Sequence, residues 1–543
     1  MIRDEQILRL GKDIFDVAII GGGINGAAVA RDAAMRGLTV ALLDKGDFAG
    51  ATSSRSSKLI HGGLRYLAQG RLGLVYEALR ERERLRHLTA PHLVRLMRFL
   101  MPVYEDRGPG RLWLGAGLLL YDVLAGLPKA ERHRNLGAAE VSACEPALRR
   151  DRLRGGALYY DASTDDARLT WENLLDAFEH GAAVANYVGL EALTANGGRL
   201  IAAAVRDVIS GRSLELRARI FVNASGPWVD AVRRLDETGA SPIVRLTKGS
   251  HLLIPRARIP VSEALALNDG AGRIVFAIPR DGYVLVGTTD TDFDGDRERV
   301  VADSADKEYL LGVLNDVFPA AGLSERDIES SFAGLRALTV TASGAPASAV
   351  SREEIILESR SGLITIAGGK LTTHRAIAQR VVDRIMRSLG RPSGRCPTLD
   401  APLPGARPLD AHPAGAECEP RESLEVIDPA IRTRLVSRYG TRAPVVANLV
   451  RERAELAAPL ATGSPVIAAE VIFAVREEMA MTVCDCLLRR MGLACSPGEA
   501  RAVAPAATRL MAEGCGWSAT RERVEQAELI ARVTTGLSPE NAS

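Results

Sequence analysis

The start of the chain alternates apolar runs with glycine-rich turns. An apolar run of strand length, Val17–Ile20, comes first. Three glycines, a helix-compatible segment, a second apolar run and an acidic residue follow in this order: Gly21, Gly23, Gly26, Ala27–Met35, Thr39–Leu43 and Asp44. Apolar runs separated by a segment with helical periodicity predict a strand–helix–strand unit.

The glycine spacing gives this unit a chemical meaning. Gly21 permits a tight turn, Gly23 lets the backbone approach a pyrophosphate, and Gly26 lets helix and strand pack closely. The helix N-terminus would present unpaired N–H groups to phosphates. Asp44, at the end of the second strand, is placed to accept hydrogen bonds from a ribose hydroxyl. The pattern therefore predicts a dinucleotide site.

Further along the chain the pattern changes from helical to strand periodicity. Helical periodicity covers Thr170–His180, and an apolar strand covers Ile220–Ala224. Two alternating segments, Arg273–Ile278 and Tyr283–Thr288, flank Asp281-Gly282, which is a strong hairpin turn signal. We therefore expect an α/β fold in which a Rossmann-like nucleotide-binding domain is interleaved with an antiparallel-sheet substrate domain, followed by a C-terminal helical domain.

Composition shifts suggest the boundaries. Residues 69–155 are predicted to be helical, basic and an excursion on the outside. Proline is dense from 391 to 422, which indicates an irregular linker. After Pro465, residues 466–490 have apolar positions at helical spacing. The expected parts are an oxidoreductase region 13–390 (nucleotide-binding 13–68, 156–240 and 330–390; substrate or cap 69–155 and 241–329), a linker 391–422 and a helical domain 423–543.

Composition restricts the class of protein. The 543 residues carry a formal net charge of +2, so no global charge argues for a nucleic-acid partner. The seven cysteines are odd in number and scattered, which fits a reducing compartment better than a disulfide framework. Cys484 and Cys486 would lie on different faces of a helix, and we expect no metal site.

Two interpretations remain open for the region before residue 128. No secretory signal and no apolar stretch of about 20 residues is visible. Residues 70–111 hold nine arginines against five acids, and the apolar segment Leu112–Leu127 follows. One interpretation is a solvated basic helix followed by a buried helix. The other is a surface whose arginines meet anionic lipid headgroups while the apolar segment dips in.

Several motifs resemble one family. The segment Gly46–Leu67 contains SSKLIHGGLRYL, which is similar to the second signature of FAD-dependent glycerol-3-phosphate dehydrogenases of the aerobic, quinone-linked type. The agreement continues along nearly all of the chain in order. The motifs are NASGPW at 223–228, KGSH at 248–251, GTTD at 287–290, GLR at 334–336, GGKLTT at 368–373 and DCLLRR at 485–490.

The resemblance implies a function. The expected cofactor is FAD, and the expected reaction oxidises sn-glycerol 3-phosphate to dihydroxyacetone phosphate by hydride transfer from C2. Electrons would pass to a membrane quinone, with the enzyme peripherally attached to the cytoplasmic face of the inner membrane. The alternatives are a glycerol-3-phosphate oxidase that uses oxygen and a catalytically silent flavin-binding protein. A homodimer is a candidate assembly, and the oligomeric state stays open.

Cations within these motifs are candidates for the substrate site. A phosphorylated triol offers a dianionic handle, for which Arg and Lys are natural partners. The resemblance implies that Arg65, Arg336 and Lys370 define the pocket, with Arg352 as a fourth member. His251 is a candidate for proton transfer, since histidine titrates near neutrality. A structural histidine at a strand start is an equal alternative, so the proton acceptor stays open.

The remaining motif positions are candidates for cofactor contacts. Gly368 and Gly369 would let backbone approach the isoalloxazine ring, and the N–H groups that follow could stabilise negative charge on it. Thr52, Ser53 and Ser54 could donate to phosphates or ring edges, although such residues also cap helices. The other positions assigned by the resemblance are Lys58, His61, Gly62, Gly226, Leu371 and Thr372.

Overall fold

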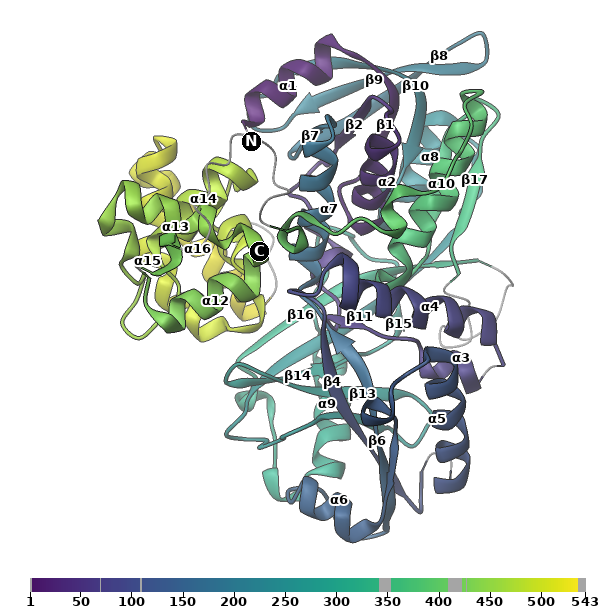
Figure 1. Cartoon of the computed structure of the whole chain (residues 1–543), viewed down its shortest axis with the longest axis vertical. Coiled ribbons are helices and arrows are strands. Elements are labelled where there is room, and N and C mark those ends of the chain that lie inside the picture. Colours follow the sequence, from purple (N-terminus) through teal and green to yellow (C-terminus); the bar gives the residue numbers. More distant parts are fainter. Residues whose placement is uncertain are drawn as a thin grey trace.

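The computed structural model describes residues 2–68, 70–107, 110–340, 353–408, 422–425 and 427–535. Within these ranges the chain forms two large sheets and a separate group of C-terminal helices (Figure 1). The first sheet carries the dinucleotide-type unit, and the second is mainly antiparallel. The expected fold class is thereby confirmed.

Strand β1 (Ile14–Ile20) lies at the centre of the first sheet, and its residues from Phe15 to Ile20 are buried. This burial explains its near-continuous apolar run, which is typical of parallel strands covered on both sides. It pairs in parallel with β2 (Val40–Leu43) and β10 (Ser213–Asn223). The sheet also contains β7 (Ala183–Ala185), β18 (Ile364–Ala367), β17 (Ile355–Glu358) and the hairpin of β8 (Val188–Asn196) and β9 (Arg199–Asp207).

Helices cover the first sheet on both faces. Helices α2, α7 and α10 pack against one face, and α1 packs against the other, where the hairpin β8–β9 also contributes. Helix α8 follows the NASGPW motif. The bounds are α1 (Arg3–Lys12), α2 (Ile24–Met35), α7 (Asp166–Glu179), α8 (Val229–Asp236) and α10 (His374–Ser388).

The second sheet is antiparallel apart from the pair β12–β4. Asp281-Gly282 forms the two-residue turn between β13 and β14, so the predicted hairpin is confirmed. Helix α9 (Ser304–Val317) covers one face. In order, the strands are β15 (Thr291–Asp292), β11 (Val244–Pro255), β14 (Tyr283–Gly287), β13 (Ile274–Arg280), β12 (Ala264–Asn268), β4 (Arg95–Tyr104), β6 (Leu153–Ser163) and β3 (Leu59–Ile60), while β16 (Ser330–Thr339) pairs with β11 and β5 (Arg134–Leu136) with β6.

Residues 69–155 differ from the helical excursion that the sequence predicts. They contribute helices α4 (Leu72–Arg84), α5 (Arg111–Ala125) and α6 (Ala138–Cys144), but β4 is an inner strand of the second sheet. The six residues at the C-terminal end of β4 are all buried, and Pro102 within them disfavours a helix. Pairing with β6 and β12 therefore makes this stretch a strand, and the helical prediction for it is wrong. Helix α3 (Leu64–Ala68) precedes α4.

The proline-rich segment is irregular where the structure describes it. Residues 391–408 contain two short 3₁₀ turns. They pack against the segment after α4, where Leu403 N–H donates to Thr89 O at 2.8 Å. Residues 409–421 of the expected linker lie outside the described part of the chain.

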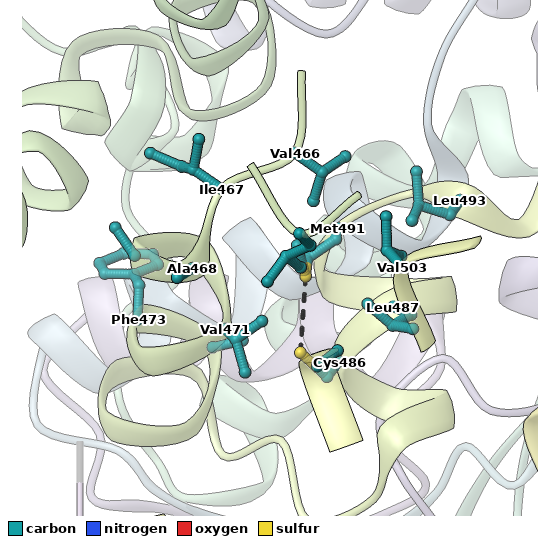
Figure 2. Packing of buried hydrophobic residues seen from close by; sticks show 14 of the residues in the cluster. Val466, Ile467, Ala468, Val471, Phe473, Cys486, Leu487, Met491, Leu493 and Val503 are labelled. Atoms are coloured by element: carbon teal, nitrogen blue, oxygen red, sulfur yellow. Dashed lines mark hydrogen bonds between the residues drawn. The ribbon is translucent and has the colours of Figure 1, made fainter. Parts of the chain in front are cut away.

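The C-terminal helices enclose a core of their own, which Figure 2 shows. Phe473, Leu487 and Met491 are fully buried in it, and the Cys486 Sγ lies 3.5 Å from the Met491 Sδ. The helix predicted across residues 466–490 is broken after Glu478, where Met479 takes a φ of +51°. The elements are α11 (Glu422–Glu425), α12 (Pro429–Tyr439), α13 (Ala443–Glu452), α14 (Ala468–Glu478), the π-helical turn Asp485–Arg490, α15 (Pro497–Cys515) and α16 (Ala519–Thr535).

Candidate active site

One large cavity, of about 2160 Å³, joins the two sheets and the C-terminal helices. It runs from the turn between β1 and α2, past β11 and β16, to helix α5. Drug-sized ligands occupy cavities of roughly 300–1,000 Å³. The volume therefore has room for a dinucleotide together with a small substrate.

The glycines of the β1–α2 turn open one end of this cavity. Gly21 has a φ of +111°, and a Cβ there would lie 2.6 Å from Ala224 O. Gly23 lines the wall as the N-cap of α2, and a Cβ there would lie 3.1 Å from the Ser53 Oγ. Gly26 does not line the wall; a side chain there would collide with Gly21 O, so this glycine permits close packing of helix and strand. These positions fit a phosphate group approaching a helix N-terminus.

Asp44 lies beside this turn at the end of β2. Its carboxylate accepts hydrogen bonds from Gly22 N–H at 2.7 Å and from Gly46 N–H at 2.9 Å. Burial raises the pKa of Asp44 to about 6, although these two N–H groups favour the charged form. A carboxylate has about four acceptor positions, so Asp44 retains capacity for ribose hydroxyls on its cavity side.

Of the consecutive hydroxyl residues Thr52, Ser53 and Ser54, the first two line the cavity. The Ser53 Oγ accepts a hydrogen bond from Ile24 N–H at 2.9 Å, and Thr52 donates to Leu335 O at 2.7 Å. Ser54 does not line the wall, and its hydroxyl turns back to Ala51 O. Gly226 lines the wall with a φ of +57° and open space where a Cβ would stand.

Arg336 on β16 lines the same cavity. Its guanidinium donates to Thr289 O at 3.0 Å, to the Thr288 Oγ1 at 2.8 Å and to the Asp290 carboxylate at 3.1 Å. A side chain at Gly249 would overlap this guanidinium, which explains the glycine of the KGSH motif. The group is thus fixed in direction while it faces the cavity.

Lys370 also lines the cavity, at the start of the 3₁₀ turn Leu371–Thr373. Its Nζ lies 3.7 Å from the centroid of the Tyr66 ring, a cation–π contact. Gly368 and Gly369 precede it with φ of +76° and +90°, and both line the same wall, as do His61 and Leu371. A glycine-rich turn next to two cations suits a site where backbone approaches a ring and side chains approach an anion.

His251 faces the same cavity from β11 but is 98% buried. Its Nε2 lies 2.9 Å from the Ser57 Oγ, and its ring stacks on Phe332 at 4.9 Å. Burial, aided by the positive charges of Arg336 and Lys58, lowers the pKa of His251 to about 3. The imidazole is therefore neutral near pH 7, and its Nδ1 has no hydrogen-bond partner in the described structure.

Some predicted cofactor contacts do not reach the cavity wall. Lys58 is buried in an ion pair with Asp166, whose charge, against the cost of burial, raises the pKa of Lys58. Gly62 N–H donates to the Tyr121 OH at 2.9 Å, and Thr372 hydrogen-bonds the backbone of His61 at 3.2 Å. These residues contact neighbouring parts of the chain and do not face the cavity themselves. The side chain of Arg65, on α3, and the whole of Arg352 lie outside the described part of the chain.

The C-terminal helices form a part of the wall that the sequence did not predict. Thr482, Asp485, Arg489 and Arg532 line the cavity from that domain, together with Asp47 and Tyr187 from the first sheet. The sequence carried one signal for this part of the wall, the charged motif DCLLRR. The family resemblance identified that motif but assigned it no function. Arg55, which follows Ser53 and Ser54, was also missed.

Comparisons with known proteins agree with this geometry. Residues 16–383 match the family model of FAD dependent oxidoreductases, and residues 396–522 match the C-terminal domain of alpha-glycerophosphate oxidase. An aerobic glycerol-3-phosphate dehydrogenase from Staphylococcus saprophyticus is 38% identical over 504 residues, which cover 90% of this chain and 89% of the relative. This chain belongs to the FAD-dependent glycerol-3-phosphate dehydrogenase family. The resemblance is thereby confirmed, and the cofactor is FAD.

Solved structures extend the comparison to the fold. The glycerol-3-phosphate dehydrogenase from Bacillus halodurans, complexed with FAD, is 30% identical, covers 98% of this chain and 97% of its own, and has a TM-score of 0.80. The L-alpha-glycerophosphate oxidase from Mycoplasma pneumoniae, at 17% identity and a TM-score of 0.55, shares the fold over 72% of this chain and 99% of its own.

The described residues contain neither a membrane-spanning helix nor a metal-binding cluster. None of the helices in the described ranges is long and apolar enough to cross a membrane. Within the same ranges, no group of three or more His, Cys, Asp or Glu side chains is arranged to hold a metal ion.

Proposed function

We propose that this chain oxidises sn-glycerol 3-phosphate to dihydroxyacetone phosphate and passes the electrons to a membrane quinone. The observation that carries the proposal is the shared cavity: Arg336, Lys370 and His251 line the same cavity as the dinucleotide turn. A relative that is 38% identical bears the name aerobic glycerol-3-phosphate dehydrogenase.

Each side chain has a role in this proposal. Arg336 and Lys370 hold the phosphate, because a fixed guanidinium and an ammonium suit a dianion. The bound FAD supplies the hydride acceptor for C2 of the substrate. The neutral His251 is a candidate to take the hydroxyl proton, and Arg65 and Arg352 are proposed from the resemblance as further substrate contacts.

The cofactor assignments are proposed on the same basis. Gly21, Gly23, Asp44, Thr52, Ser53, Gly226, Gly368, Gly369, His61 and Leu371 would contact FAD, and their places on the cavity wall support this. Gly26, Ser54, Lys58, Gly62 and Thr372 would act by holding neighbouring backbone. We also propose the boundaries 13–390, 391–422 and 423–543 for the oxidoreductase region, linker and helical domain.

The quinone and membrane parts of the proposal rest on helix α5. Trp113, Leu114 and Leu120 line the far end of the cavity. On the same helix, Leu112 is 90% exposed, and Trp113, although it borders the cavity, is 80% exposed. A lipid-soluble acceptor would then reach the cavity directly from a bilayer surface. We place the enzyme at the cytoplasmic face of the membrane, and the homodimer stays a prediction.

An anaerobic spectrum of the purified protein tests the dehydrogenase reaction. Adding glycerol 3-phosphate should bleach the visible flavin absorbance, and glycerol should not, because it lacks the phosphate. Arg336→Ala should lower kcat/KM by a factor equivalent to about 3 kcal/mol, with normal flavin content. Arg258→Ala is the control, since Arg258 pairs with Asp327 at the surface.

The outcomes separate the proposal from its alternatives. Bleaching followed by stoichiometric hydrogen peroxide in air, with no quinone reduction, would identify an oxidase. Absence of bleaching with full flavin content would leave a silent flavin-binding protein. Equal activity on glycerol and its phosphate would contradict the phosphate-binding roles of Arg336 and Lys370.

A further inference from the structure

The motif Asp485–Arg490 contacts the loop that follows β2, residues 44–50. The buried Asp47 accepts hydrogen bonds from the Arg489 Nε at 2.6 Å and from two nitrogens of Arg490 at 2.7 and 2.8 Å. Although burial alone would favour the protonated form, Arg490 and Arg489 lower the pKa of Asp47 to about 2. A carboxylate from the nucleotide-binding domain is thus bound by two arginines of the C-terminal domain.

A second set of contacts holds the same loop from its other side. The Tyr187 OH donates to the buried Asp485 carboxylate, at 2.9 Å from each oxygen. The backbone N–H of Tyr187 donates to Gly46 O at 2.9 Å, and Val188 N–H donates to Asp44 O at 2.7 Å. The loop that carries Asp44 is therefore held by Arg489 and Arg490 through Asp47 and by backbone hydrogen bonds from residues 187 and 188, and Tyr187 also contacts Asp485.

These groups also face the cofactor cavity. Asp47, Tyr187, Asp485 and Arg489 line the same cavity as Asp44, and Arg532 on α16 joins them. Figure 1 shows α16 with the other C-terminal helices to one side of the two sheets. The C-terminal domain is therefore in contact with the dinucleotide end of the cavity.

Three arginines, Arg55, Arg489 and Arg532, line the cavity where the two domains meet, and acidic side chains such as Asp47, Glu298 and Glu528 line it with them. Arg55 lines the cavity and donates to Ala333 O at 3.3 Å. Burial, together with the nearby charges of Arg532 and Arg489, lowers the pKa of Arg55 to about 10. Arg489 pairs with Asp47 and Asp485, and Arg532 with Glu528, but no described carboxylate lies within ion-pair distance of Arg55. Arg55, whose charge no described ion pair offsets, is thus complementary to a polyanionic ligand such as a dinucleotide.

We propose that the C-terminal helical domain is part of the FAD site: Arg489 clamps the Asp44 loop through Asp47, and Arg532 with Arg55 supplies positive charge to the dinucleotide. The inference rests on FAD as cofactor and does not depend on the substrate of the proposed function. Arg489 is a positioning residue, because it acts on the ligand through Asp47 and the loop. Removing it should loosen the loop while the Arg490–Asp47 pair keeps the domains together.

The test measures how fast FAD leaves the purified holoenzyme after dilution, with released flavin separated by ultrafiltration. Arg489→Gln should release FAD at least tenfold faster than the parent, and Arg532→Gln several-fold faster. Arg489→Lys should restore part of the retention, because it keeps the charge. Arg509→Gln is the control, since Arg509 is exposed on α15 of the same domain.

Circular dichroism and the unfolding temperature of each flavin-stripped variant distinguish a cofactor role from general loss of stability. Faster release with an unfolding temperature equal to that of the flavin-stripped parent supports the proposal. A release rate within twofold of the parent in both Arg489→Gln and Arg532→Gln overturns it. If Arg489→Gln does not fold, Arg532→Gln decides alone, since Arg532 lies near the C-terminal end of the described chain and pairs only with its helix neighbour Glu528 among described carboxylates. None of these readings requires turnover, so failure of the proposed substrate would not affect them.

Discussion

Asp44 combines burial with two backbone hydrogen bonds, and burial has the larger effect on its ionisation. With a pKa of about 6 in the cofactor-free chain, the carboxyl holds a proton at pH 5 and has lost it at pH 7.5. A ribose hydroxyl donates to the ionised form, so bound FAD would favour loss of that proton. The residue thereby links cofactor affinity to pH.

We expect FAD affinity for the apoprotein to rise as pH increases through about 6, by up to about tenfold per pH unit below it. Titrating apoprotein with FAD at pH 5 and 7.5 measures this slope. In Asp44→Asn, which cannot ionise, the slope should flatten while affinity at pH 7.5 falls. The same slope in both proteins would show that another group is responsible.

His251 shows what sequence reasoning about single residues omits. Its residue type made it a candidate for proton transfer, which stays a prediction, and the structure brings it to the cavity near Arg336. Its expected titration near neutrality depended on solvent exposure, and its location under Phe332 removes that exposure. Burial is a property of the whole fold, and no pattern within KGSH specifies it.

At the scale of elements, the structure shows that the basic segment, residues 70–111, and the apolar segment, Leu112–Leu127, are not equally suited to contact a bilayer. The arginines expected to face lipid are largely occupied within the protein. The ion pairs are Arg82–Asp161, Arg84–Glu81, Arg86–Glu131, Arg98–Glu263 and Arg107–Asp316. Helix α5, which one interpretation buried, instead exposes Leu112, Trp113 and Val123. The apolar face of α5 is thus the better candidate for contact with a bilayer.

We therefore expect vesicle binding to depend on α5 and to persist at high salt, because apolar insertion is not screened. Replacing Leu112 and Trp113 together by Ser should lower partition into vesicles at least tenfold, since each large apolar side chain contributes roughly 1.5–3 kcal/mol. Flotation at low and high salt measures this. Val208→Ser, an exposed apolar position after β9, is the control.

Reduction of a soluble dye should stay normal in the α5 variant while quinone reduction falls with vesicle binding. Unchanged partition would assign membrane contact to another surface. Release of the parent protein by salt alone would return the role to exposed arginines such as Arg80.

At the scale of the whole molecule, features that depend on local sequence patterns could be predicted, and features that depend on long-range contacts could not. The β1–α2–β2 unit and the Asp281-Gly282 hairpin were predictable, because their signals lie within about thirty residues. The inner position of β4 and the C-terminal wall of the cavity were not. Asp47 and Arg490 are 443 residues apart, and only the assembled fold brings their charges together.

Buried ion pairs across the domain boundary make joint unfolding of the domains the expected behaviour. Arg168 on α7 donates to the Glu478 carboxylate at 2.6 Å, both side chains being almost fully buried, and Arg438 pairs with Asp165 at 2.9 Å. Separating the C-terminal helices would leave these charges and Asp47 without their partners. Leaving a buried charge without its partner costs several kcal/mol of folding free energy. Calorimetry of the holoenzyme should therefore show one transition.

Glu478→Gln tests this coupling, because it keeps the shape of the side chain and removes its charge. Glu172 remains 3.5 Å from Arg168 and compensates in part, so the loss should be near the lower end of the range for broken buried pairs, about 3 kcal/mol. Calorimetry should show the single transition at lower temperature. Glu513→Gln, an exposed acid on α15, should leave it unchanged. If the parent already melts in two steps, or if the variant lowers only a separate C-terminal transition, the boundary is a weak contact, and the C-terminal wall of the cavity can open without unfolding the FAD-binding domain.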